Sequence, residues 1–111
     1  VKWALDQVNS PNFKCMLDLA APFTYGEPVC SYFEKMGEDC KHIHFVDCEK
    51  TSEDHLIPGD GEMDFPRIVR YLKEVGYDGY LSLELFSRYA NEPDYAAERG
   101  YQVIRELLDE N

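Results

Sequence analysis

Hydrophobic residues along this chain follow two alternating patterns, short continuous runs and stretches with helical spacing. Apolar runs over 13–19, 42–47 and 80–86 predict three strands. The first run is apolar on both faces, as expected of a parallel strand that is covered on both sides. Between and after these runs, apolar positions recur every three or four residues, which predicts amphipathic helices.

Capping and turn residues mark the ends of the predicted helices. Residues 1–9 have the pattern of the end of a helix, followed by the turn cluster 9–12. A second helix follows Pro28 and ends at Gly37, and a third begins after the N-cap Asp64 and ends at Gly76. A fourth begins near 91–93. Its inner face is expected to carry Ala97, Tyr101, Ile104 and Leu108.

The order of these elements predicts an α/β fold. Strands that alternate with helices form parallel sheets with right-handed crossovers. A closed (β/α)8 barrel needs about 250 residues, whereas this chain has 111. We therefore predict that residues 1–111 form one piece of a larger TIM barrel domain. An open flavodoxin-like sheet is the rival architecture, but its nucleotide-binding versions are disfavoured because no Gly-rich phosphate loop follows any predicted strand.

Charge and cysteine content narrow the range of partners and locations. The chain carries 22 acidic and 11 basic residues, a formal net charge of −11. Nucleic-acid binding needs a basic surface, so DNA, RNA and anionic membranes are poor partners. No apolar run approaches the ~20 residues that a transmembrane helix requires. The four cysteines form no C-x-x-C pair and no zinc-site spacing, and free thiols of this kind predict a cytoplasmic location.

Each predicted strand delivers ligand-type side chains near its carboxyl end, namely Asp18 in the first, His42, His44 and Asp47 in the second, and Glu84 in the third. Parallel α/β folds bind ligands at this end of the sheet, and an Asp, a His and a Glu delivered in this way can form a divalent-metal cluster. Structural roles are the alternative, since Asp18 can cap the following turn and Glu84 can form an ion pair. Of the two histidines in the middle strand, we expect His44 to line the site and His42 to pack against the helices.

Several motifs, taken together, resemble a known family. They are Met16-Leu17-Asp18, Gly26-Glu27-Pro28, His42-Ile43-His44, His55-Leu56-Ile57-Pro58-Gly59-Asp60-Gly61, Leu83-Glu84-Leu85 and Asn91-Glu92-Pro93. On these residues the chain resembles the C-terminal half of the sugar isomerase/epimerase family, the xylose isomerase-like TIM barrels, and fructoselysine 3-epimerases in particular. The resemblance implies a partial TIM barrel made of the last three βα units.

The resemblance also implies roles for individual residues. A divalent cation would be held by Asp18, His44 and Glu84, with another Glu on a preceding strand that this chain does not contain. Glu84 would also be catalytic, as one of two carboxylates that move a proton next to a ketose carbonyl. Asp47 and Lys50 match substrate-binding positions of ketose epimerases, although both can equally be exposed loop charges. Where many ketose epimerases carry a substrate-contacting His, this chain has Ala21, which favours a bulkier, amino-acid-conjugated sugar over a free hexose.

The expected function is therefore that of a metal-dependent sugar epimerase with a small-molecule sugar substrate. Because one ligand is missing, this chain is expected to bind Mn²⁺ or Mg²⁺ weakly and to be inactive alone. An inosose dehydratase-type lyase on the same barrel is one alternative. A non-catalytic fragment that associates with itself is another, because unpaired strand edges favour association, and we expect a homo-oligomer. DNA-repair endonucleases of this fold are disfavoured by the acidic charge and the small number of histidines.

Overall fold

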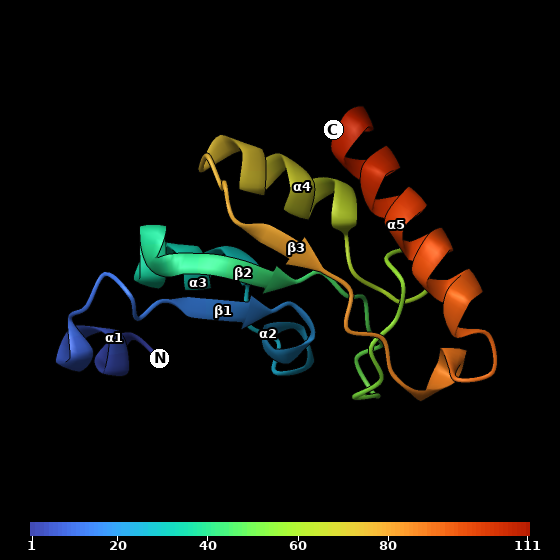
Figure 1. The fold of residues 1–111 in the computed structure, drawn as a ribbon, viewed down its shortest axis with the longest axis horizontal. Coiled ribbons are helices and arrows are strands. Elements are labelled where there is room, and N and C mark those ends of the chain that lie inside the picture. The colour runs from blue at the N-terminus through green and yellow to red at the C-terminus, as the bar shows by residue number, and fades with distance from the viewer.

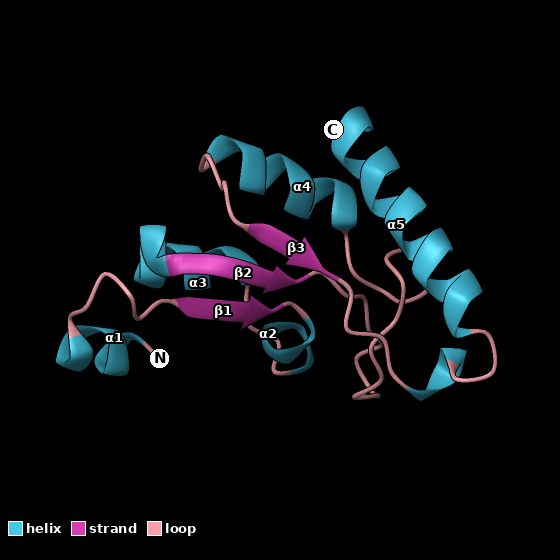
Figure 2. Cartoon of the chain, viewed as in Figure 1, coloured by secondary structure: helices cyan, strands magenta, loops and turns pink.

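The computed structural model places all residues 1–111 and contains one three-stranded parallel sheet with helices between the strands (Figures 1 and 2). The strands lie side by side in the order β1-β2-β3. Their bounds are Cys15–Asp18 for β1, Cys40–His44 for β2 and Tyr80–Ser82 for β3. The helices are α1 Lys2–Val8, α2 Ala20–Thr24, α3 Val29–Met36, α4 Phe65–Glu74 and α5 Pro93–Glu110, with 3-10 turns at Gly37–Asp39 and Ser87–Tyr89. The prediction of alternating strands and helices with a parallel sheet is confirmed.

Most helix boundaries follow the predicted caps. The Asp64 carboxylate accepts a hydrogen bond from the backbone N–H of Arg67 at 3.1 Å, and a proline lies in the first turn of α4. Gly37 and Gly76 follow α3 and α4 with positive φ values of 52° and 68°, a conformation that glycine adopts without strain. The short helix α2 was not predicted, because its five residues are too few to show a helical period.

β1 and β3 are shorter than predicted, and β2 runs over 40–44 instead of 42–47. Past Phe45, whose backbone N–H still donates to the carbonyl of Ser82, the chain pairs with a loop instead of a neighbouring strand. Past the end of β2, the chain forms an isolated antiparallel bridge between Asp47 and Leu56. Past the end of β3, the backbone N–H of Phe86 donates to the carbonyl of His55 at 3.3 Å. A long loop from the 48–62 region therefore takes the place of continued strand pairing.

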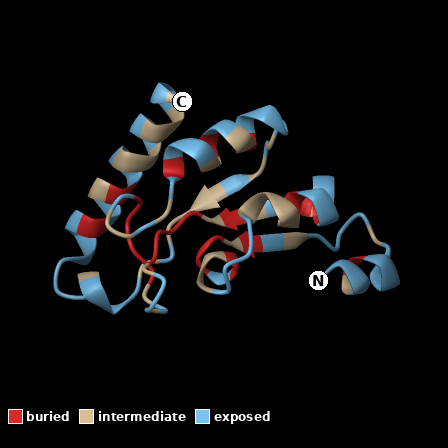
Figure 3. Cartoon of the chain, turned by 180° about the vertical axis from the view of Figure 1, so that it is seen from behind, coloured by how far each residue is buried: buried red, intermediate tan, exposed pale blue.

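One face of the sheet is covered by helices and holds the core. Leu17 and Ile43 are buried there together with Phe33 of α3 and with Val69 and Leu72 of α4. Burial of such aliphatic and aromatic side chains contributes about 1.5–3 kcal/mol each. Figure 3 shows the buried residues gathered where β1 and β2 end and along the inner sides of the helices.

The opposite face of the sheet is only partly covered. The register aligns Met16 with His42 and His42 with Tyr80, so these three side chains form one row across the strands. Met16 is 42% exposed and Tyr80 is 77% exposed. The prediction that His42 packs against the helices is wrong, because residues two apart in a strand share a face. The His42 ring lies 5.6 Å from the His44 ring and its Nε2 lies 2.7 Å from Ser82 Oγ.

The inner face of α5 differs from the predicted one. Ala96 and Gly100 are its buried residues, whereas Ala97 is exposed and Tyr101 is 65% exposed. The cause is a close crossing at Gly100, where a Cβ atom would lie 2.4 Å from Leu83 Cδ1. Gly100 therefore makes the close contact with the residue after β3, while Tyr101 lines the neighbouring groove with most of its side chain exposed. Ile104 and Leu108 pack against the core as predicted. No helix is both long enough and apolar enough to cross a membrane.

Candidate metal centre

The carboxyl ends of the three strands bring the predicted ligand residues together. Asp18 is the last residue of β1 and lies in register with His44, the last residue of β2. Glu84 follows β3 by two residues, which keeps its side chain on the same face of the sheet. His44 Nδ1 lies 3.2 Å from Asp18 Oδ2 and 3.0 Å from Glu84 Oε2. Parallel strands thus place one imidazole between two carboxylates.

The two oxygens of Asp18 have separate roles. Oδ1 accepts a hydrogen bond from the backbone N–H of Ala20 at 2.9 Å, which caps the turn that begins α2. Oδ2 faces the histidines instead. The turn-capping role and the ligand role are therefore compatible in this residue, because each uses a different oxygen.

The donors fit a divalent cation. His44 Nδ1 lies 3.0–3.2 Å from one oxygen of each carboxylate, which is the spacing of adjacent ligands around an ion with bonds of about 2.1 Å. Oxygen and imidazole donors suit Mn²⁺, Mg²⁺ or Zn²⁺ more than soft metals. All three side chains are also partly accessible, with Glu84 the most exposed of them, which leaves a ligand room to approach.

A fourth residue, His55, lies in this cluster, and the sequence predicted no role for it. Its Nε2 is 3.6 Å from Asp18 Oδ2 and its Nδ1 is 3.4 Å from Glu84 Oε2. Ligand atoms of Asp18, His55 and Glu84 all lie within 4.8 Å of one another. His55 reaches the site from the long loop after β2, and so no strand pattern identified it. Its place at the start of the Ile57-Pro58-Gly59 turn was the available signal.

Asp47 lies outside the cluster and organises that loop. Its side chain is fully buried. Oδ1 accepts hydrogen bonds from the backbone N–H groups of Cys48 and Met63, and Oδ2 accepts from those of Gly59 and Gly61, at 2.8–3.1 Å. Gly61 must be a glycine here, since a Cβ atom would lie 2.5 Å from Asp47 Oδ1. Contact between Asp47 and a substrate stays a prediction.

Lys50 also lies outside the cluster, on the exposed part of the loop. Its backbone N–H donates to Glu62 Oε2 at 2.7 Å, and its Nζ lies 5.9 Å from the centre of the Phe23 ring. Its role as a substrate contact is likewise still a prediction.

The cysteines have structural positions. All four are free, and Cys40 and Cys48 are buried. Burial raises the pKa of the Cys40 thiol to about 11 and that of the Cys48 thiol to about 11. Thiols with such values are protonated at neutral pH and unreactive.

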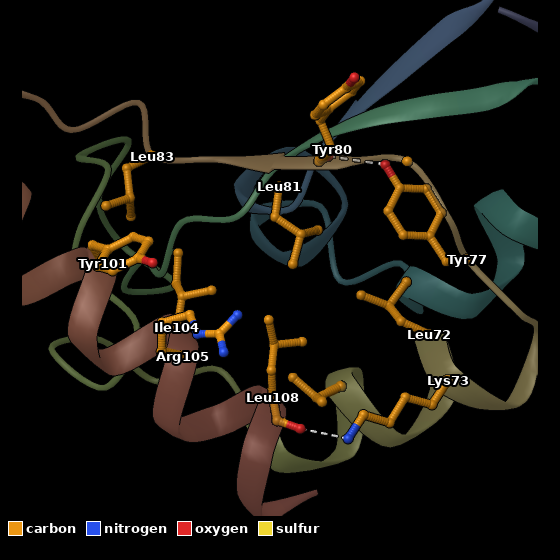
Figure 4. Close-up of a pocket in the computed structure, with 12 residues that line it drawn as sticks. Leu72, Lys73, Tyr77, Tyr80, Leu81, Leu83, Tyr101, Ile104, Arg105 and Leu108 are labelled. Atoms are coloured by element: carbon orange, nitrogen blue, oxygen red, sulfur yellow. Dashed lines mark hydrogen bonds between the residues drawn. The ribbon is translucent and has the colours of Figure 1, made fainter.

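An apolar groove lies apart from the cluster. It has a volume of about 470 Å³ and lies between β3, α4 and α5 (Figure 4). Leu81, Ile104 and Leu108 point into it, and the Tyr77 hydroxyl donates to the carbonyl of Tyr80 at 2.9 Å at one end. The groove contains none of the four clustered residues.

Comparisons with known proteins agree with this geometry. Residues 3–107 match the family model described as xylose isomerase-like TIM barrel. The chain is 41% identical over 108 residues to fructoselysine 3-epimerase of Escherichia coli O157:H7, covering 97% of this chain and 39% of that protein. It is 33% identical over 76 residues to inosose dehydratase of Lacticaseibacillus casei, covering 53% of this chain and 26% of that protein.

A solved structure shows the same arrangement of elements. The crystal structure of a D-tagatose 3-epimerase-like protein superposes with a TM-score of 0.73 at 26% identity, covering 96% of this chain and 39% of that chain. The present chain thus spans about two fifths of the length of these relatives. Its three parallel strands match a partial barrel, as predicted, and not an open flavodoxin-like sheet.

Proposed function

Because this chain belongs to the xylose isomerase-like TIM barrel family, we propose that it is part of a divalent-metal-dependent sugar epimerase of the fructoselysine 3-epimerase type. Its relatives include fructoselysine 3-epimerase and inosose isomerase. The observation that carries the proposal is the convergence of Asp18, His44 and Glu84 at the carboxyl end of the sheet. These side chains provide the donors and the carboxylate that epimerisation next to a carbonyl requires.

Asp18, His44 and Glu84 would hold the cation. When bound, a divalent cation supplies Lewis acidity that stabilises negative charge developing on the oxygen of a neighbouring carbonyl. The backbone N–H of Ala20 keeps Asp18 oriented through Oδ1, which leaves Oδ2 available. His44 is held by its position at the end of β2, in register with Asp18.

Glu84 has the second role of moving the proton. Its carboxylate is the most exposed of the three groups, so it can reach a carbon-bound hydrogen of a sugar. Inversion at that carbon needs a second acid or base on the opposite face of the substrate. The 111-residue chain offers no second carboxylate from a preceding strand, and so we expect it to bind the cation weakly and to show no epimerase activity alone.

We propose a ketose that carries an amino-acid group as the substrate class. The relative with 41% identity is a fructoselysine 3-epimerase. Ala21 leaves the position three residues after Asp18 without a long side chain. Lys50 is the proposed substrate-binding residue of the loop, because it has the accessible charge that such a role needs. The buried Asp47 would support that contact by fixing the path of the loop.

The test of this function is a Glu84→Gln substitution in the full-length protein. The substitution nearly preserves size and removes the base, so we expect kcat on fructoselysine with Mn²⁺ to fall by about 10²- to 10⁴-fold. Glu53→Gln is the matched control, because Glu53 is exposed in the loop and outside the cluster. Wild-type turnover by the Glu84 variant would show that this residue is only a structural anion and would refute the mechanism.

A dehydratase of the inosose type is the second candidate. The observation that favours it is the 33% identity to inosose dehydratase over about half of this chain. Both reactions begin with removal of a proton next to a carbonyl, but only the lyase goes on to expel a hydroxyl group as water. Mass spectrometry of the product from an inosose and from fructoselysine separates them, since the lyase product is lighter by one water.

A further inference from the structure

We propose that His55 is a positioning residue that fixes the main chain at Glu84 and so holds the Glu84 carboxylate beside Asp18 in the geometry that binds the cation. This inference rests on the proposed metal site and adds a residue to it. The imidazole lies between the two carboxylates, with Nε2 at 3.6 Å from Asp18 Oδ2 and Nδ1 at 3.4 Å from Glu84 Oε2. One ring from a loop thus lies beside the acid that ends β1 and the acid that follows β3.

Hydrogen bonding determines which ring nitrogen is already in use. His55 Nδ1 lies 3.0 Å from the backbone oxygen of Glu84. A carbonyl oxygen only accepts hydrogen bonds, so Nδ1 carries a hydrogen and donates it. The ring is therefore attached to the main chain at Glu84, directly behind the carboxylate that serves as ligand and base. Loss of a partner that orients a metal ligand in this way commonly lowers the metal affinity about 10- to 100-fold.

Packing removes the freedom of the ring to turn away. His55 is only 8% exposed. It stacks on the Phe86 ring with centroids 3.9 Å apart and planes 9° from parallel. The backbone carbonyl of His55 also accepts a hydrogen bond from Phe86 N–H at 3.3 Å. The segment of residues 84–86 and His55 are thus joined by a side-chain bond, a backbone bond and a stacked pair.

The loop that carries His55 is itself fixed to the end of β2. Leu56, the next residue, exchanges two backbone hydrogen bonds of 2.8 Å with Asp47. The buried carboxylate of Asp47 binds four further backbone N–H groups of the same loop. His55 therefore has the rigid support that a side chain needs in order to fix the positions of other groups.

Binding of Mn²⁺ to the 111-residue chain, followed by electron paramagnetic resonance at up to millimolar metal, tests this role. His55→Phe keeps a flat ring against Phe86 but removes both nitrogens, and we expect Mn²⁺ affinity to fall by about 10- to 100-fold. His55→Asn restores an N–H near the place of Nδ1, so part of the lost affinity should return. Tyr95→Phe is the control, because Tyr95 is exposed on α5 and is not a member of the cluster.

His44→Ala separates this proposal from the proposed function. If His44→Ala weakens Mn²⁺ binding and His55→Phe, folded by circular dichroism, binds like wild type, the role of His55 is refuted and the cation site stands. If His44→Ala and wild type bind equally, the cation site itself is wrong. A lower affinity of His55→Phe without recovery in His55→Asn would also refute the proposal, because the effect would then not depend on the bond to Glu84.

Discussion

Asp47 illustrates how a single buried carboxylate determines the path of a long loop. Four backbone N–H groups, spread from Cys48 to Met63, point at its two oxygens. Charge-assisted hydrogen bonds of this kind are about twice as strong as neutral ones. The loop has little apolar side chain of its own to bury between Glu49 and Asp54, and so this carboxylate is the centre around which it folds.

We predict that Asp47→Asn lowers the free energy of unfolding by about 3 kcal/mol. The amide NH₂ of Asn would replace one carboxylate oxygen. The backbone N–H groups that now donate to that oxygen would then face another donor and lose their hydrogen bonds. Urea unfolding followed by circular dichroism measures the effect, with Glu53→Gln in the same loop as the control. A change of less than 0.5 kcal/mol, about the size of an ordinary surface substitution, would show that the loop does not depend on this carboxylate.

Helix α5 is connected to that loop by a second charged group. Arg99 donates two hydrogen bonds to the Asp60 carboxylate, at 2.7 and 2.6 Å. The Tyr89 hydroxyl donates to Asp60 Oδ2 at 2.7 Å and accepts from the backbone N–H of Ile57 at 2.9 Å. Burial and the bond to Asp60 raise the pKa of Tyr89 to about 12. The helix, the loop and the 3-10 turn are thereby joined at one point.

This connection predicts a dependence of stability on pH. The hydrogen bonds from Arg99 hold the pKa of Asp60 below its ordinary value of 3.8. A lowered carboxylate pKa stabilises the fold fully above about pH 4 and less as the pH falls through the folded-state value. Asp60→Asn should therefore cost about 1 kcal/mol at pH 7, allowing for solvent screening, and less at pH 3.

Urea unfolding of wild type and Asp60→Asn at both pH values measures this difference. Asp94→Asn provides the control, because Asp94 is exposed in the first turn of α5. An equal cost of Asp60→Asn at pH 7 and pH 3 would contradict the assigned pKa direction.

The whole molecule has two open sheet edges and one poorly covered sheet face. β1 and β3 each pair on one side only. The row of Met16, His42 and Tyr80 lies on the open face, and the apolar groove beside β3 adds further accessible hydrophobic surface (Figure 4). Open edges and apolar patches both favour association. Without the remaining strands of a barrel, contact with a second chain is the available way to cover them.

We predict that the isolated chain forms a homo-oligomer, with a molar mass above the 12.9 kDa of one chain in light scattering. Tyr80→Lys should shift the distribution toward monomer, since a charge on an exposed edge strand opposes edge pairing. Tyr25→Lys is the matched control, because Tyr25 is also exposed but follows α2 away from the sheet edge. A monomer at every concentration would refute self-association.

Local patterns determined the type and order of the elements. Apolar runs and helical spacing depend on which faces must be buried, so the parallel α/β arrangement, the Asp64 cap and the glycine-terminated helices could all be predicted. The end of β1 was predicted to within one residue, whereas β2 ends three residues before its predicted end. The pairing of Asp18 with His44 came from the family resemblance, and the structure places these two residues in register at the carboxyl end of the sheet.

Tertiary contacts decided what the local patterns do not contain. The side of α5 that packs against the rest of the molecule depends on the close approach of Gly100 to Leu83. The length of β3 depends on the loop, because the backbone N–H of Phe86 pairs with His55 and not with a strand. Asp47 has the same local pattern as an exposed loop acid, and only the folded loop brings four N–H groups to it. His55 joined the cluster for the same reason, because sequence spacing carries no information about where a long loop returns.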